Sequence, residues 1–75
     1  MFEVGDIVYY ARILKTTNIY TTLALKVATI YSTYFAAVDE SNQRFLFDYK
    51  DVGKIVFGNK KEAEEVVMNA TTAEI

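Results

Sequence analysis

The stretch FLFDYKDVGKIVFGNKKEAEEVV, residues 45–67, contains two expected strands, a turn and the start of a helix. Phe45 and Phe47 share one face of the first strand, because side chains alternate along extended backbone. Gly53 allows the bend that follows, since glycine adopts a positive φ that a side chain would resist. The β-branched and aromatic run from Ile55 to Phe57 has the composition of a second strand, buried on at least one face.

A capped helix is expected directly after this second strand. Asn59 and Glu62 have the spacing of an N-cap residue and its reciprocal partner, which together satisfy free backbone N–H groups. Behind the cap, one apolar stripe recurs at helical spacing, formed by Ala63, Val66, Val67 and Ala70. The stretch therefore predicts two strands followed by an amphipathic helix.

Three more strands are expected before this stretch. A turn at residues 4–6, where Gly5 supplies backbone freedom, leads into the first strand. Polar residues 15–18 and 39–43 mark loops, and the second of these is the clearest hairpin loop in the chain. The expected strands are, in order, residues 7–14, 21–31, 34–38, 44–48 and 54–57.

Five short strands joined by hairpins must avoid long bare edges, and closure into a partly open barrel is the usual solution. We therefore expect one mainly β domain over residues 1–75, a small five-stranded SH3-like barrel with one C-terminal helix. The helix is expected to plug one end of the barrel or to cover one side, and an OB-like barrel is the alternative. Residues 71–75 lack periodicity, and residues 69–75 are expected to form a frayed tail.

The composition excludes several chemistries. The 75 residues include neither cysteine nor histidine, so disulfides, thiolate sites and the usual zinc ligand sets are absent. Ser32 and Ser41 have no histidine to activate them, and no glycine-rich loop cradles phosphate. No apolar run approaches the ~20 residues of a membrane span, and residues 1–6 have no signal-peptide features. We therefore expect a cytoplasmic protein that is not an enzyme and binds no cofactor.

Four acidic residues allow two interpretations. Asp48 and Asp51, with Asp39 and Glu40, could hold a divalent ion or carry out acid–base chemistry. A spacing of three residues within a turn is far more often hairpin chemistry with solvated side chains. We therefore predict neither a metal site nor a catalytic residue.

Both ends of the chain resemble a known family. The segments FEVGDIV, residues 2–8, and FDYKDVGKIVF, residues 47–57, look like small SH3-like proteins encoded in Firmicutes genomes and in the phages and prophages of those bacteria. That family typically has Asp-x-Gly-Lys-x-Val-Phe and then a Thr- or Ser-capped helix containing Glu-Ala-Glu. Here DVGKIVF at 51–57 and EAE at 62–64 match, while Asn59 replaces Thr or Ser at the cap.

The resemblance covers both ends of the chain but not residues 15–44. Its motif is architectural, so it assigns no catalytic or binding residue. It implies a mobile-element context, in which small acidic proteins often inhibit host enzymes or immune systems, as anti-CRISPR proteins do.

The chain has six tyrosines, more than a barrel of this size is expected to bury. Tyrosine combines a large apolar face with a polar tip, which suits protein interfaces. Tyr20, Tyr31 and Tyr34 lie beside polar loops and are expected to be exposed. Together with Asp39 and Glu40 of the acidic C-terminal half, they are the predicted partner-binding residues.

Three functional classes remain. The favoured class is a protein-binding module that docks on a host or phage protein, for example to inhibit a host-defence nuclease by occupying its basic channel. The second is a nucleic-acid-binding barrel that uses Arg12, Lys15 and Lys26 with tyrosines as stacking surfaces. The net charge of −2 argues against it, because phosphate neutralisation supplies most of such affinity. The third is a sponge for a nucleotide or another small ligand, with tyrosines stacked on a base.

The first strand is apolar on both faces, which favours a dimer or a complex. One face carries Ile7, Tyr9 and Ile13, and the other carries Val8, Tyr10 and Leu14. A small barrel interior takes only one set, and apolar patches left in water usually mark an interface. The alternative is that the barrel and the helix together bury both sets within one chain.

Overall fold

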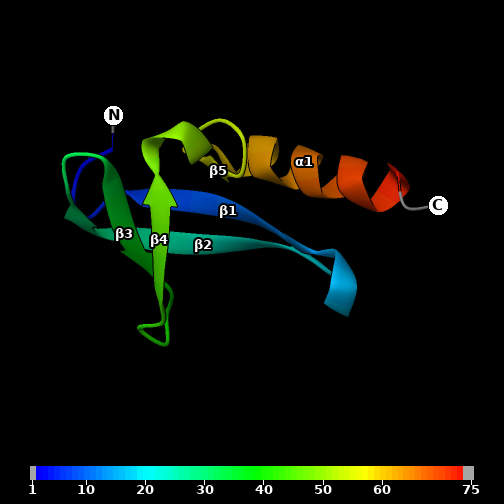
Figure 1. Cartoon of the computed structure of the whole chain (residues 1–75), viewed down its shortest axis with the longest axis horizontal. Helices are drawn as coiled ribbons and strands as arrows, with labels where there is room; N and C mark the ends of the chain where they lie inside the picture. Colours follow the sequence, from blue (N-terminus) through cyan, green and yellow to red (C-terminus); the bar gives the residue numbers. More distant parts are fainter. Residues whose placement is uncertain (1, 74–75) are drawn as a thin grey trace.

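The computed structural model describes residues 2–73 and shows five antiparallel strands in one sheet of order β4-β3-β2-β1-β5. The sheet curls into a half-barrel, with one helix beside it (Figure 1). This confirms a mainly β, SH3-like, partly open barrel with one C-terminal helix. The elements are β1 (Ile7–Leu14), η1 (Lys15–Thr17), β2 (Ile19–Ile30), β3 (Tyr34–Val38), β4 (Arg44–Asp48), η2 (Tyr49–Asp51), β5 (Val56–Phe57) and α1 (Lys60–Ala73).

Two strands differ from the sequence-based bounds. β2 begins at Ile19 rather than at residue 21, because its pairing with β1 continues to the end of that hairpin. β5 begins at Val56 rather than at residue 54. The N–H groups of Lys54 and Ile55 instead donate to the carbonyl of Asp51, each at 3.0 Å, which keeps both residues in the turn. The short 3-10 helix η2 was not predicted.

The two turn glycines adopt backbone conformations that other residues rarely adopt. Gly53 has a φ of +85° and Gly5 a φ of +98°. The N–H of Gly5 also donates to the carbonyl of Val27 at 2.8 Å, which ties the start of β1 to β2. Both glycines therefore set where a strand of the barrel begins or ends.

The barrel interior is centred on Phe35, which is fully buried. Its ring lies 5.6 Å from that of Phe2, 5.5 Å from that of Phe47 and 5.7 Å from that of Tyr49, measured between centroids. The buried residues of this inner core come from all five strands: Val8, Leu25, Val27, Phe35, Ala37, Phe47 and Val56.

Helix α1 covers the outer face of β1, opposite the barrel interior (Figure 1). Ala63 of the helix is fully buried against Ala11 of β1 and Phe57 of β5. The helix therefore covers one side of the barrel rather than plugging an end. Within residues 2–73, no helix has the length and apolar character needed to cross a membrane.

The barrel interior and helix α1 together bury most of the apolar surface of β1. Val8 is buried in the barrel interior and Ala11 beneath the helix. Only the strand ends stay bare, with Ile7 47% and Leu14 36% exposed. In the middle of β1, both faces are therefore buried within one chain. Self-association stays a prediction.

Helix α1 begins at a side-chain cap and extends further than expected. The Asn59 Oδ1 accepts the N–H of Lys61 at 2.8 Å. No reciprocal bond from Glu62 to the Asn59 N–H is present among the described residues. At the other end, the hydroxyls of Thr71 and Thr72 donate to carbonyls four residues earlier, each at 2.9 Å. Residues 69–73 are therefore helical rather than an irregular tail, and residues 74–75 of the expected tail lie outside the described residues.

The cap yields a stability prediction. Asn59→Ala should lower the free energy of unfolding by about 1 kcal/mol, because the Lys61 N–H loses its acceptor. Asn59→Thr keeps an acceptor and should cost little. Asn69→Ala, at an exposed position in the same helix, is the matched control and should cost nothing. Equal losses for Asn59→Ala and Asn59→Thr in urea denaturation would show that the cap has no such role.

Candidate protein-binding site

The β2 strand has an open edge along its first half. β2 has 12 residues, of which Ile19–Lys26 pair with β1, whereas β3 has only 5 residues and pairs with β2 only from Lys26 to Ile30. Within residues 2–73, no strand lies beside residues 19–25 on the β3 side. The chain turns away into the β3–β4 loop at this point.

The hydrogen bonds show which backbone groups face the open side. The Ala11 N–H donates to the Ile55 carbonyl at 2.8 Å, away from β2. Ala11 and its partner Thr22 are therefore a non-hydrogen-bonded pair, so the N–H and C=O of Thr22 point to the open side. By alternation, those of Tyr20 and Ala24 do so too, because the β1–β2 register is regular there. We call these three outward-facing residues, Tyr20, Thr22 and Ala24, the β2 edge.

The β2 edge lacks the usual protection against pairing with another chain. Proteins normally blunt such edges with charged residues, proline, bulges or a covering loop. Residues 19–25, IYTTLAL, contain neither a charge nor a proline. The outer side of β5, by contrast, is covered by its own turn, where the Gly53 N–H donates to the Val56 carbonyl at 2.9 Å. The β2 edge is thus available to a sixth strand.

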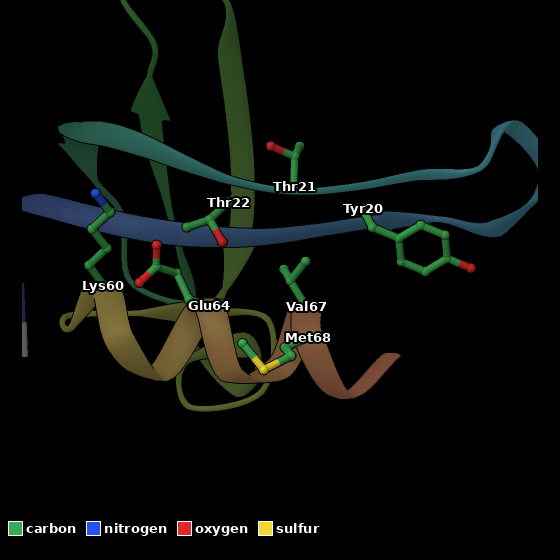
Figure 2. Close-up of a pocket in the computed structure, with 7 residues that line it drawn as sticks. All are labelled: Tyr20, Thr21, Thr22, Lys60, Glu64, Val67 and Met68. Atoms are coloured by element: carbon green, nitrogen blue, oxygen red, sulfur yellow. The ribbon is translucent and has the colours of Figure 1, made fainter. Parts of the chain in front are cut away.

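Continuous grooves run along the β2 edge. The first, of about 490 Å³, lies between β2 and α1 (Figure 2). Its lining from the helix is Lys60, Glu64, Val67 and Met68. A second groove, of about 290 Å³, shares Thr22 with the first and extends past Ala24 to the β3–β4 loop at Asp39, Glu40 and Ser41. An extended segment lying on the edge would therefore contact the helix first and the loop next.

The side chains around the first groove differ in direction and in polarity. In Figure 2, Glu64 and Val67 point from the helix toward the strands, while Thr21 points away from the helix. Met68 is 64% exposed and lines the same groove as Tyr20. The helix thus lines the groove with two apolar side chains, Val67 and Met68, and with the carboxylate of Glu64.

Acidic groups dominate the charge along the two grooves. The lining contains three carboxylates, Asp39, Glu40 and Glu64, against one ammonium group, that of Lys60. The Asp39 Oδ1 accepts the N–H groups of Ser41 at 2.8 Å and Gln43 at 2.9 Å, so this carboxylate has a defined position. Glu40 is exposed on the same loop. The site therefore favours a ligand with positive charge.

The structure brings together three of the five predicted partner-binding residues. Tyr20, Asp39 and Glu40 all line the grooves of the β2 edge. Tyr20 is half-buried rather than exposed, because the end of α1 lies beside it. Tyr31 and Tyr34 lie beyond the other end of β2, where both are exposed, and their rings stack with centroids 4.5 Å apart.

Two of the three residues that form the β2 edge were missed by the sequence reasoning. Thr22 and Ala24 carry no recognisable motif, and their importance comes from outward-facing backbone. The only available signal was the difference in length between the long second strand and the five-residue third strand. Met68 was missed because it lies outside the apolar stripe of the helix.

Asp48 and Asp51 organise a turn. The Asp51 carboxylate accepts the Asp48 N–H at 3.1 Å, and the Asp48 carboxylate accepts the Lys50 N–H at 3.3 Å. These reciprocal bonds cap η2. They agree with the interpretation that Asp48 and Asp51 stabilise a turn. Across residues 2–73, no group of three or more acidic, histidine or cysteine side chains could hold a metal ion.

No family model, curated protein or solved structure matches the chain. The resemblance to SH3-like proteins of Firmicutes and their phages therefore stays a prediction. The geometry and charge of the β2 edge are the features that indicate a function.

Amide exchange should report the open edge directly. The N–H groups of Tyr20, Thr22 and Ala24 should exchange with solvent deuterium much faster than those of Thr21, Leu23 and Leu25, which face β1. Nuclear magnetic resonance (NMR) spectra of the ¹⁵N-labelled protein resolve the six positions. Protection of Thr22 and Ala24 equal to that of Leu23 in the isolated chain would show that the edge is already covered.

Asp39 should act on stability through the loop. Asp39→Ala removes the acceptor for two backbone N–H groups and should cost about 1 kcal/mol of unfolding free energy. Glu40→Ala, at the next position, removes a carboxylate that makes no hydrogen bond within residues 2–73 and should cost almost nothing. Thermal unfolding of both variants tests this difference, and equal melting temperatures would contradict it.

Proposed function

We propose that this chain is a non-enzymatic protein-binding module that adds an extended segment of a partner protein to the β2 edge. The observation that carries the proposal is that residues 19–25 pair with β1 on one side and, within the described part of the chain, have no strand neighbour on the β3 side. Strand addition to such an edge is a common mode of peptide recognition, in which main-chain hydrogen bonds supply affinity and side-chain pockets supply specificity.

The energetics require both the edge and its grooves. Tyr20, Thr22 and Ala24 each offer one donor and one acceptor, and each new hydrogen bond contributes about 1 kcal/mol net. Association costs at least ~4 kcal/mol in lost translational and rotational freedom. Backbone pairing alone therefore gives weak binding. Contacts in the grooves, above all with Val67 and Met68, supply the remainder.

The other two classes have less support at this site. A nucleic acid would bring its phosphates toward three carboxylates and one ammonium group, which is unfavourable. A small ligand usually occupies an enclosed, mostly apolar pocket, whereas these grooves are open along the strand. An extended peptide matches their length and their free backbone groups.

The resemblance of both chain ends to phage and prophage proteins supports a host or phage protein as the partner. Inhibition of a host-defence nuclease is the role that we propose for such a complex, because an acidic module can occupy a basic nucleic-acid channel. The proposal also assigns the protein to the cytoplasm, since a cysteine-free chain needs no oxidising compartment to fold.

A proline at the edge tests the proposal. Thr22→Pro removes an outward N–H and places a ring where the incoming strand would lie, while the bonds from β2 to β1 remain. Thr22→Val is the matched control, because it retains the N–H. Partners captured on the immobilised protein from a host lysate and identified by mass spectrometry should be lost with Thr22→Pro and retained with Thr22→Val.

Retention of the same partners by both variants would exclude strand addition at this edge. Ala24→Pro is an independent second variant, and its control is Ala24→Ser. The circular dichroism spectrum of each variant shows whether the barrel has formed, so that loss of binding is distinguished from loss of the fold.

A further inference from the structure

We infer that the segment received by the β2 edge runs antiparallel to β2, carries a basic residue at its N-terminal end and has apolar residues at alternate positions after it. This inference rests on the proposed function and names the chemistry of its partner. It follows from the direction of β3, the placement of α1 and the charge of the grooves.

The direction follows from the neighbouring strand. β3 runs antiparallel to β2, and its last residue, Val38, lies opposite Lys26. A segment antiparallel to β2 would continue the line of β3 along the edge, with its N-terminal residue opposite Ala24. Every strand pairing in the sheet is antiparallel, and this arrangement is slightly more stable per residue than a parallel one.

The N-terminal residue of that segment would meet the acidic loop. Ala24 lines the second groove together with Asp39 and Glu40. Asp39 is held by its two hydrogen bonds to the loop backbone, so its charge stays near this end of the edge. Two carboxylates outnumber the one ammonium group at this end of the edge, that of Lys26. A lysine or arginine opposite Ala24 would therefore be attracted there, and a glutamate would be repelled.

The helix determines the next positions of the pattern. Thr22 lies opposite Ala11, whose side chain packs under α1, so directly paired residues here share the helix face of the sheet. Segment residues opposite Thr22 and Tyr20 would therefore point to the groove lined by Val67 and Met68. Apolar side chains at these two positions would cover the exposed Met68. The intervening residues face the other side of the sheet and are less restricted.

The same charges disfavour a second copy of this chain at the edge. Pairing about a two-fold axis at Thr22 would place each copy's Glu64 on the same face near the axis, because Thr22 and Glu64 line one groove. Each copy would also bring its own excess of carboxylates. Like charges at such short range oppose pairing, whereas a basic segment offsets them.

Three synthetic pentapeptides test the inference on the full chain. The first is acetyl-Lys-Thr-Val-Thr-Val-amide, and the second is its reverse, acetyl-Val-Thr-Val-Thr-Lys-amide. The third, acetyl-Glu-Thr-Val-Thr-Val-amide, replaces the basic residue. NMR titration of the ¹⁵N-labelled protein gives the Kd of each peptide, and amide exchange shows whether Thr22 and Ala24 become protected.

We expect the Lys-first peptide to bind about tenfold more tightly than the other two and to protect Thr22 and Ala24. Glu40→Lys should reverse the preference between the Lys-first and Glu-first peptides. Glu65→Lys makes the same charge change on α1 at a position outside both grooves, and it should leave the preference as it is.

The possible failures are distinguishable. If no peptide protects Thr22 and Ala24 at millimolar concentration, both the proposed function and this inference are overturned. If the peptides protect the edge but show no preference, or prefer the reversed order, only the inference is overturned. Sedimentation equilibrium showing a dimer that Thr22→Pro converts to a monomer would overturn the inference in favour of a second copy.

Discussion

The architecture depends on the need to cover both faces of β1. This strand is apolar on each face, so one cover is insufficient to keep it out of water. The curled sheet covers one face, where Val8 joins the Phe35 cluster, and α1 covers the other, where Ala63 packs on Ala11. A helix that must reach β1 cannot also plug the barrel, which explains its position along the side.

That position creates the candidate site. The helix packs on the β1–β2 hairpin, and among residues 2–73 it forms no backbone hydrogen bond with the strands, so it does not pair with the outward-facing backbone groups of the β2 edge. The short β3 strand leaves the same segment uncovered on its outer side. A groove between a helix and a free strand edge results, and it combines backbone groups with apolar and acidic side chains. The chemical character of the candidate site is thus a consequence of how the core is covered.

Local turn chemistry then determines where the charges lie. Asp39 accepts two backbone N–H groups in the β3–β4 loop, and Asp48 and Asp51 exchange bonds at η2. All three carboxylates have structural partners, yet only Asp39 lies at the β2 edge. Aspartate therefore has a structural role at each of these turns, and only the turn beside the β2 edge also contributes charge to the candidate site.

The sequence by itself determined the elements with local signals. The polar loop at residues 39–43 predicted where β3 ends and β4 begins, glycine predicted the turn at Gly53, and Asn59 with the apolar stripe predicted the start of α1. It also selected Tyr20, Asp39 and Glu40, although without indicating that they line neighbouring grooves along one strand edge. Only the tertiary structure decided that placement and the open backbone of Thr22 and Ala24. The physical reason is that strand periodicity specifies which face a side chain occupies, whereas a free edge depends on which strand lies alongside and where that strand ends.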